Sequence, residues 1–301
     1  HAAPLALINP HAAAGPGREL CSAGLALKVA QAMLGSEAPR RLAAYLDLAA
    51  LGTLADYVPL LEESRAIAAA GLPRILHTCR PGLARLCEAT GTQRPTTEHV
   101  IRRLVPRLNA FGRLGDPTTA WHLLLDQSDE RLEGWLAESE GAHQTTKALH
   151  NRILGEAQEQ VSRLHFRDQF VLVVSRTGWH QGLMGPLASQ LTARFGRPAI
   201  ALAMDRAGMG TGSGRSIPMF NLLDALKSCQ DLLIRFGGHA QACGLTINGK
   251  HLEAFRMMVN RQAEGLLGRE GLLQRRSVDL ELPLAAITSA WVREAERFAP
   301  F

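Results

Sequence analysis

The chain has 301 residues, 46% of them hydrophobic, which is enough for the cores of two domains of ordinary size. Its net charge of +5 and isoelectric point near 9.2 favour a polyanionic partner without identifying one. It contains no signal peptide and no apolar run of the roughly 18 residues that a membrane span needs. Five cysteines without a CxxC pair are typical of reduced thiols, so the composition argues against a membrane-spanning or disulfide-built protein and predicts a cytoplasmic one.

The first part of the chain is mostly helical in pattern, up to about residue 127. Leu5 to Asn9 is typical of the end of a buried strand. Apolar residues at helical spacing, with few β-branched residues, predict helices in the segments Ala23–Met33, Tyr45–Asp56 and Arg65–Leu76. Asp116 followed by Pro117 has the pattern of a helix N-cap with proline at the first helical position, so we expect a helix that continues through Leu125.

The second part begins with a change of amino-acid composition. Residues 128–164 are rich in Glu, Gln and Arg and predict one or two long, exposed helices that join two domains. Strands and helices then alternate, which predicts a small α/β domain. Its expected elements are a strand at 169–174, a turn at Gly178, a helix near 184–195, a strand at 199–203, a Gly-rich hairpin at 208–214, a helix near 221–229 and a Gly-Gly turn at 237–238. A strand from Val278 to Leu282 and a helix from Ala285 to Phe298 would open a third domain.

Asp56 is the first residue that could carry chemistry. It is a lone carboxylate in strongly apolar company, and a buried carboxylate needs a cation or hydrogen-bond donors beside it. A helix cap or a partner for Arg65 is one interpretation, and a metal ligand is the other.

Arginines gather in the next segment of interest. Arg102, Arg103, Arg107 and Arg113 lie around Gly112 and Gly115, a composition that suits a phosphate-contacting loop. A solvated basic face is the alternative.

Three further segments lie in the α/β part. Gly178-Trp179-His180-Gln181-Gly182 follows the first strand directly, where a βα loop presents side chains beside a helix N-terminus that favours anions. His180 could donate to a phosphate or act as an acid, while Trp179 could simply cover the end of the sheet.

Glycine-rich segments complete the set. Gly208 to Ser216 would let the backbone approach a ligand, with Ser213 and Arg215 as a hydroxyl and a fork for a terminal phosphate. The segment fits neither a P-loop nor a nucleophile elbow. Phe236 to Gly244 could aim His239 at a ligand from a Gly-Gly turn. A zinc pair of His239 and Cys243 lacks two further ligands.

Taken in order, these segments resemble the later motifs of the RecJ exonucleases, in the DHH phosphoesterase superfamily. The matching stretches are ALGTLADYVPL, PRLNAFGRLGDP, GWHQGLMGPLASQL, GSGRS and FGGHAQACGLTI. The resemblance implies an α/β protein in four parts, with the closing VDLELP similar to the start of an OB-fold. The parts are the C-terminal part of a DHH domain at 1–127, a connecting helix at 128–166, a DHHA1 domain at 167–270 and the start of a truncated OB-fold at 271–301.

The resemblance also implies roles for individual residues. Asp56 matches the motif aspartate that binds a catalytic Mn²⁺ or Mg²⁺, and His180 is a further catalytic candidate. The residues that match substrate-binding positions are Arg107, Asn109, Arg113, Gln181, Ser213, Arg215, Gly237, Gly238 and His239. The family's earlier motifs, including the DHH triplet, are absent, so we expect the other ligands of a two-metal site to be missing from this chain.

The implied function is a 5′→3′ exonuclease that releases mononucleotides from single-stranded DNA bearing a 5′ phosphate, in DNA repair and recombination. Two other functions stay open: an inactive DNA-binding scaffold, and a phosphodiesterase for short oligonucleotides or cyclic dinucleotides. A single-strand-binding protein and a helicase are the implied partners. Because aromatic residues make up only 5% of the chain, base stacking should be limited to Trp179 or Phe111, and phosphate contacts should dominate.

Overall fold

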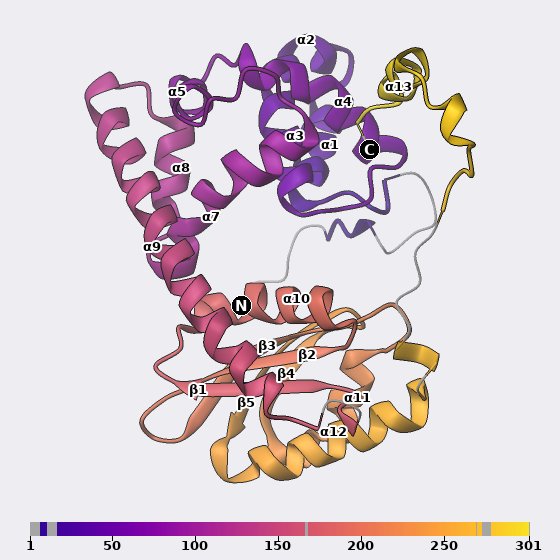
Figure 1. Cartoon of the computed structure of the whole chain (residues 1–301). Coiled ribbons are helices and arrows are strands. Elements are labelled where there is room, and N and C mark those ends of the chain that lie inside the picture. The colour runs from indigo at the N-terminus through magenta and orange to yellow at the C-terminus, as the bar shows by residue number, and fades with distance from the viewer. Residues whose placement is uncertain (1–6, 11–16, 166–167, 269, 273–277, 301) are drawn as a thin grey trace. The chain divides into compact units, whose positions relative to one another are not determined.

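The computed structural model describes residues 7–10, 17–165, 168–268, 270–272 and 278–300. They form two compact units, one within residues 1–143 and 280–301 and the other within 144–279. None of the described helices is long and apolar enough to cross a membrane. Each unit is described by itself below (Figure 1).

The first unit is helical. Its elements are α1 Ser22–Leu34, η2 Gly35–Glu37, α2 Ala38–Leu42, η3 Ala43–Tyr45, α3 Leu46–Ala55, α4 Glu62–Leu76, α5 Pro81–Ala89, α6 Thr97–His99, the π-helical η4 Val100–Leu104, α7 Val105–Leu114, α8 Thr118–Leu125, the start of α9 Asp129–Ser162, η10 Leu284–Ala286 and α13 Ser289–Glu296. α3 packs against α4, and the core joins Leu51, Leu72 and Leu83 to Leu104 and Leu132. The helix predicted after Asp116 is confirmed as α8, but it begins one residue later, with Pro117 at the N-cap. The backbone N–H of Thr118 donates to Asp116 Oδ1 at 2.9 Å.

The second unit contains the five-stranded sheet. Its elements are the rest of α9, β1 Leu172–Thr177, η6 Gln181–Leu183, α10 Met184–Phe195, β2 Ala199–Met204, β3 Met209–Arg215, α11 Leu222–Ser228, η7 Gln230–Leu232, β4 Leu233–His239, β5 Ala242–Asn248, η8 Gly249–His251, α12 Leu252–Leu267 and η9 Glu270–Leu272. The strand order is β1-β2-β3-β5-β4, with β1 and β2 parallel and the other neighbours antiparallel.

Helices cover both faces of this sheet, with α10 on one side and α11 and α12 on the other (Figure 1). Strand alternation explains the two cores, since successive side chains point to opposite faces. Val173 and Ile200 pack with Phe255 of α12, whereas Leu172 and Ala201 pack with Leu187 of α10 and with α9. The prediction of an α/β fold is therefore confirmed. The expected connecting segment is a single helix, α9, of 34 residues.

Two turn predictions were wrong. The Gly-rich segment 208–214 is mostly the strand β3, and its hairpin turns at Asp205–Gly208. The Gly237-Gly238 pair lies inside β4, and the β4–β5 hairpin turns at Ala240 and Gln241. At Gly238 the neighbouring backbone lies close, since a Cβ there would sit 2.2 Å from the carbonyl oxygen of Ala242.

The strands predicted at the two ends were also wrong. Leu7 to Asn9 are exposed and form no strand, while Leu5 and Ala6 lie outside the described residues. Val278 to Leu282 form no strand either, and Val278 and Leu280 are exposed. A strand needs a partner for its backbone groups, and none of the described strands pairs with either segment. The helix predicted at 285–298 is shorter, α13 Ser289–Glu296.

A substitution at Gly212 would test how closely β2 and β3 approach each other. A Cβ there would lie 1.9 Å from the carbonyl oxygen of Ala201, and backbone cannot rotate away as a side chain can. We expect Gly212→Ala to lower the free energy of unfolding by about 3 kcal/mol. Gly244→Ala is the matched control, because its Cβ would meet nothing closer than 3.9 Å. Urea unfolding of both variants checks this; equal midpoints would contradict the close approach.

Candidate functional site

Five of the predicted site residues lie in neighbouring rungs of the sheet. Ser213 pairs with Gly244, which pairs with Gly237, and Arg215 pairs with Ala242, which pairs with His239. Ser213 also pairs with Ala201, whose side chain lies in the core that α10 covers. Alternation therefore places Ser213 and Arg215 on the α10 face of the sheet. Gly238, in the rung between, belongs to the opposite face.

Arg215 is held in place by neutral groups. Its Nη1 donates to Ser213 Oγ at 2.7 Å and to the carbonyl oxygen of Gly214 at 2.8 Å. Ser213 Oγ in turn donates to the carbonyl oxygen of Cys243 at 3.2 Å. Partial burial lowers the pKa of the Arg215 guanidinium below its ordinary value. Among the described residues no carboxylate forms an ion pair with Arg215, so a half-buried cation is left without an anion.

Open space lies along the sheet beside Arg215, whereas Gly185 of α10 lies close to its guanidinium. A Cβ at Gly237 would meet nothing within 4 Å, and one at Gly244 only an atom at 3.9 Å. At Gly185, in the first turn of α10, a Cβ would lie 3.0 Å from Arg215 Nη2 and 3.7 Å from Ser213 Oγ. The guanidinium thus lies beside the beginning of a 12-residue helix, an end that favours anions.

The loop of the GWHQG segment leads into that same helix. His180 is exposed, and its Nδ1 accepts from the backbone N–H of Gly182 at 3.2 Å. His239 is also exposed, and its Nδ1 accepts from the N–H of Gln241 at 3.4 Å. A neutral imidazole whose Nδ1 accepts carries its proton on Nε2, so each ring can donate one hydrogen bond. Gln181 is exposed at the start of η6.

The Trp179 side chain is buried and attaches this loop to α9. Its ring is 6% exposed, and its Nε1 donates to Glu156 Oε2 of α9 at 2.6 Å. Arg176 lies 3.6 Å from the same carboxylate oxygen. Phe111, the other residue expected to stack on bases, is 3% exposed. Both stacking predictions were therefore wrong, because each ring is part of a core.

Asp56 takes the helix-cap position that was one of the two interpretations, but it is not buried. It is exposed at the C-cap of α3, and no ion pair joins it to Arg65 in the described part of the chain. The buried aspartate is Asp47, at the other end of the same helix, with an exposed fraction of 2%. Asp47 Oδ2 accepts from Thr78 Oγ1 at 2.5 Å and lies 3.4 Å from Arg80 Nε. The sequence analysis missed this pair, since nothing in the spacing connects Asp47 to Arg80.

The arginine segment is a helix and not the predicted loop. Pro106 occupies the first turn of α7, where its missing N–H is tolerated. Arg107 is engaged: its Nε donates to Glu140 at 2.7 Å and its Nη1 to the carbonyl oxygen of Arg103 at 2.9 Å. Asn109 is exposed and, four residues before Arg113, shares a face of α7 with it.

Arg113 lies close to the end of α3. Burial lowers the pKa of its guanidinium, and the electrostatic interaction with Tyr57 opposes that shift. This interaction indicates that Arg113 lies in the region of Tyr57, the residue that follows Asp56. The structure thus brings Asp56 and Arg113 into one region, while it ties Arg107 to α9.

Metal ligands do not gather in the described residues. No three His, Cys, Asp or Glu side chains in that part of the chain could hold a metal ion together. Asp56 alone does not make such a site. His239 and Cys243 belong to adjacent strands, and burial raises the pKa of the Cys243 thiol, which donates to the carbonyl oxygen of His239. The Cys243 side chain is therefore part of the buried core and is not a zinc ligand.

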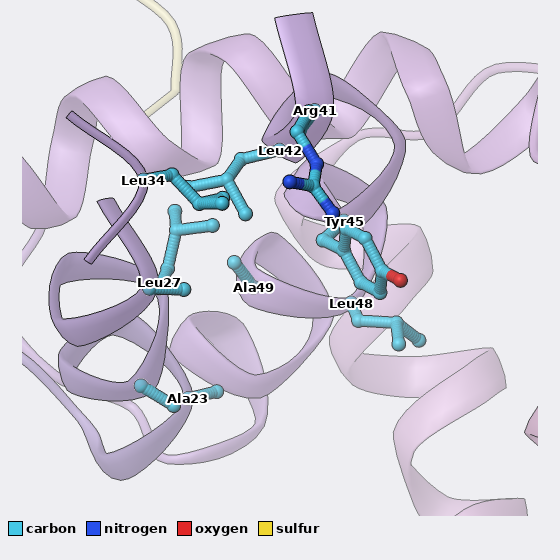
Figure 2. Close-up of a pocket in the computed structure, with 10 residues that line it drawn as sticks. Ala23, Leu27, Leu34, Arg41, Leu42, Tyr45, Leu48 and Ala49 are labelled. Atoms are coloured by element: carbon cyan, nitrogen blue, oxygen red, sulfur yellow. The ribbon is translucent and has the colours of Figure 1, made fainter. Parts of the chain in front are cut away.

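The first unit also contains an apolar cavity of about 580 Å³ among α1, α2 and α3. Leu27, Leu34, Leu42 and Leu48 line it, with Arg41 beside them (Figure 2). None of the predicted site residues lines this cavity, and its aliphatic walls offer few groups to an anion.

Comparisons with known proteins agree with the fold. The DHHA1 domain family matches residues 168–265. The chain is 38% identical over 289 residues to the single-stranded-DNA-specific exonuclease RecJ of Bacillus subtilis (strain 168), a match that covers 95% of this chain and 36% of that protein. It is 37% identical over 225 residues to the Escherichia coli (strain K12) protein of the same name, covering 71% of this chain and 39% of that one.

Solved structures lead to the same group. The crystal structure of RecJ in complex with Mn²⁺ from Thermus thermophilus matches with a TM-score of 0.69 and 31% identity, over 78% of this chain and 34% of that one. The Mg²⁺ complex from the same organism matches with the same TM-score and identity. The chain spans between 31% and 48% of the length of the curated relatives it matches.

Proposed function

We propose that this chain, which belongs to the RecJ family, holds the 5′ phosphate of single-stranded DNA as part of a 5′→3′ exonuclease. One observation carries the proposal: the half-buried Arg215 guanidinium has neutral partners, Ser213 beside it and an open glycine surface along the sheet. A terminal phosphate would provide the missing anion. It would accept from the guanidinium fork and from the Ser213 hydroxyl.

Nearby groups extend this binding site. The beginning of α10 adds a favourable dipole, and the imidazoles of His180 and His239 offer Nε2–H donors. Gly237 and Gly244 leave space for the ligand to approach the sheet. A phosphate monoester carries more charge than an internal phosphodiester, so a site with an unpaired cation favours a strand end. Anchoring the 5′ end would let the enzyme release mononucleotides one at a time.

The hydrolytic reaction is the second part of the proposal. The relatives are named as exonucleases specific for single-stranded DNA, and two similar structures as complexes with Mn²⁺ and Mg²⁺. For this chain we propose dependence on a divalent cation, with Asp56 as one carboxylate ligand. The described residues do not complete a metal site, so further ligands would have to come from elsewhere. Arg113, and Asn109 on the same face of α7, would contact phosphates of the strand.

The biological setting stays a prediction. DNA repair and recombination, a cytoplasmic location, and a single-strand-binding protein and a helicase as partners all follow from the family resemblance. All five cysteines are free thiols, which agrees with a reducing compartment.

Equilibrium binding to labelled DNA tests the proposed substrate. We expect a 5′-phosphorylated single strand to bind more tightly than the blunt duplex of the same sequence, because the end phosphate has to reach a half-buried guanidinium beside α10. The dissociation constant should rise with salt, since each phosphate contact on a single strand adds about 0.7 to the logarithmic slope. Equal binding of strand and duplex, or no salt dependence, would contradict the proposal.

A further inference from the structure

Tyr57 is an exposed aromatic residue directly after the candidate metal ligand Asp56. Its side chain is 68% exposed, in contrast to the buried rings of Trp179 and Phe111. Its backbone has a φ of 54°, in the left-handed region that bulky residues rarely adopt. Such conformations are found at functional sites more often than elsewhere. The chain turns here out of α3 and leaves the ring in solvent.

A cavity of about 590 Å³ lies beside this ring. Its apolar lining comes from Leu54, Val58, Leu60 and Ile101. Its polar lining includes Glu98 and Arg102, whose side chains form an exposed ion pair at 3.2 Å. The volume falls within the range of small-molecule sites, and an apolar lining with polar groups near it suits an aromatic heterocycle.

The charges around the ring point to a nucleic acid. Arg113 interacts electrostatically with Tyr57, and Arg102 lines the same cavity as Tyr57. An aromatic ring with arginines near it can stack on a base while the cations attract the phosphates that flank the base.

We propose that Tyr57 stacks on a nucleobase of the bound single strand and that the adjoining cavity receives this base. The inference rests on the proposed function, because it assigns a base subsite to the same substrate. Glu98 and Arg102 can meet the donors and acceptors of the base edge. Since every base has a π-face, the subsite would tolerate all four bases.

Oligonucleotides that lack a single base test whether Tyr57 stacks on a base. The probes are 5′-phosphorylated oligonucleotides, one intact and the others lacking a single base at successive positions. We expect one abasic position to weaken binding to the unaltered chain about tenfold. Tyr57→Leu should weaken binding of the intact strand by the same factor. Removing the base at the sensitive position should then weaken binding to this variant no further. Tyr57→Phe should bind as the unaltered chain does.

Photocrosslinking provides a measurement that needs no variant. A strand with 5-iodouracil at the sensitive position should crosslink to Tyr57, located by mass spectrometry of the digested chain. A Tyr57→Leu variant that binds every strand like the unaltered chain overturns the inference, and so does a crosslink confined to other residues. If the 5′-phosphate preference persists in that case, the proposed function stands without the base subsite. If the chain binds no single strand, both proposals are overturned.

Discussion

Replacing Arg215 by alanine is expected to weaken binding of a 5′-phosphorylated single strand about 10- to 100-fold. Hydrogen bonds between charged groups contribute about 1.5–3 kcal/mol, and the variant removes the fork that would contact the phosphate. The serine hydroxyl and the beginning of α10 would remain. Fluorescence anisotropy with a labelled strand at fixed salt measures the change directly.

Arg206→Ala is the matched control for this experiment. Arg206 is exposed in the turn before β3, at the opposite end of that strand from Arg215, and its removal lowers the net charge equally. We expect the control to change the affinity only slightly, as a distant charge would. If both variants lost the same affinity, Arg215 would be acting through general charge and not through a built phosphate site.

Asp47→Ala is expected to lower the free energy of unfolding by about 3–5 kcal/mol. The substitution leaves Arg80 as a buried cation without its ion pair, and removing one partner of a buried pair is costly. It also removes the acceptor of the Thr78 hydroxyl and of the Leu48 backbone N–H. Urea unfolding followed by circular dichroism gives the change from the shift in midpoint.

Asp56→Ala is the control within the same helix. Asp56 is exposed at the C-terminal end of α3, where a carboxylate gains nothing from the helix dipole. We expect its removal to change the stability by no more than about 0.5 kcal/mol. A large loss at Asp56 and a small one at Asp47 would reverse the assignment of structural and functional aspartates.

The two aspartates show where sequence reasoning reached its limit. Nine residues separate them, which at 100° per residue places them on roughly opposite faces of one helix. An almost continuously apolar segment does not reveal which face is buried. That is decided by packing against α4, the next helix along the chain, and by Arg80, which lies beyond it. The motif identified Asp56, but its exposure and the burial of Asp47 required the fold.

The α/β unit was more accessible to prediction. Runs such as Val171 to Val174 indicate a buried strand, and the helix predicted at 184–195 matches α10. The glycines were misread as turns because sequence cannot show that another backbone lies against them. Gly237 and Gly238 are extended residues of β4 because β5 pairs with them. The hairpin determines this pairing, and local propensity does not.

Candidate site residues were found by pattern, while their partners were not. Ser213 and Arg215 were paired in the sequence analysis, and alternation puts residues two apart on one face of a strand. Three features each join separate elements: the closeness of Gly185 to Arg215, the ion pair of Arg107 with Glu140 and the hydrogen bond from Trp179 to Glu156. These long-range contacts decide which predicted residues remain accessible to a ligand.

The most direct test of the 5′-phosphate site is a thermodynamic cycle of four dissociation constants. The unaltered chain and Arg215→Ala are each titrated with the same single strand carrying either a 5′ phosphate or a 5′ hydroxyl. We predict that the phosphate strengthens binding to the unaltered chain at least tenfold and has almost no effect on the variant. If the phosphate strengthens binding of both proteins equally, or of neither, Arg215 does not hold the 5′ end and the account is wrong.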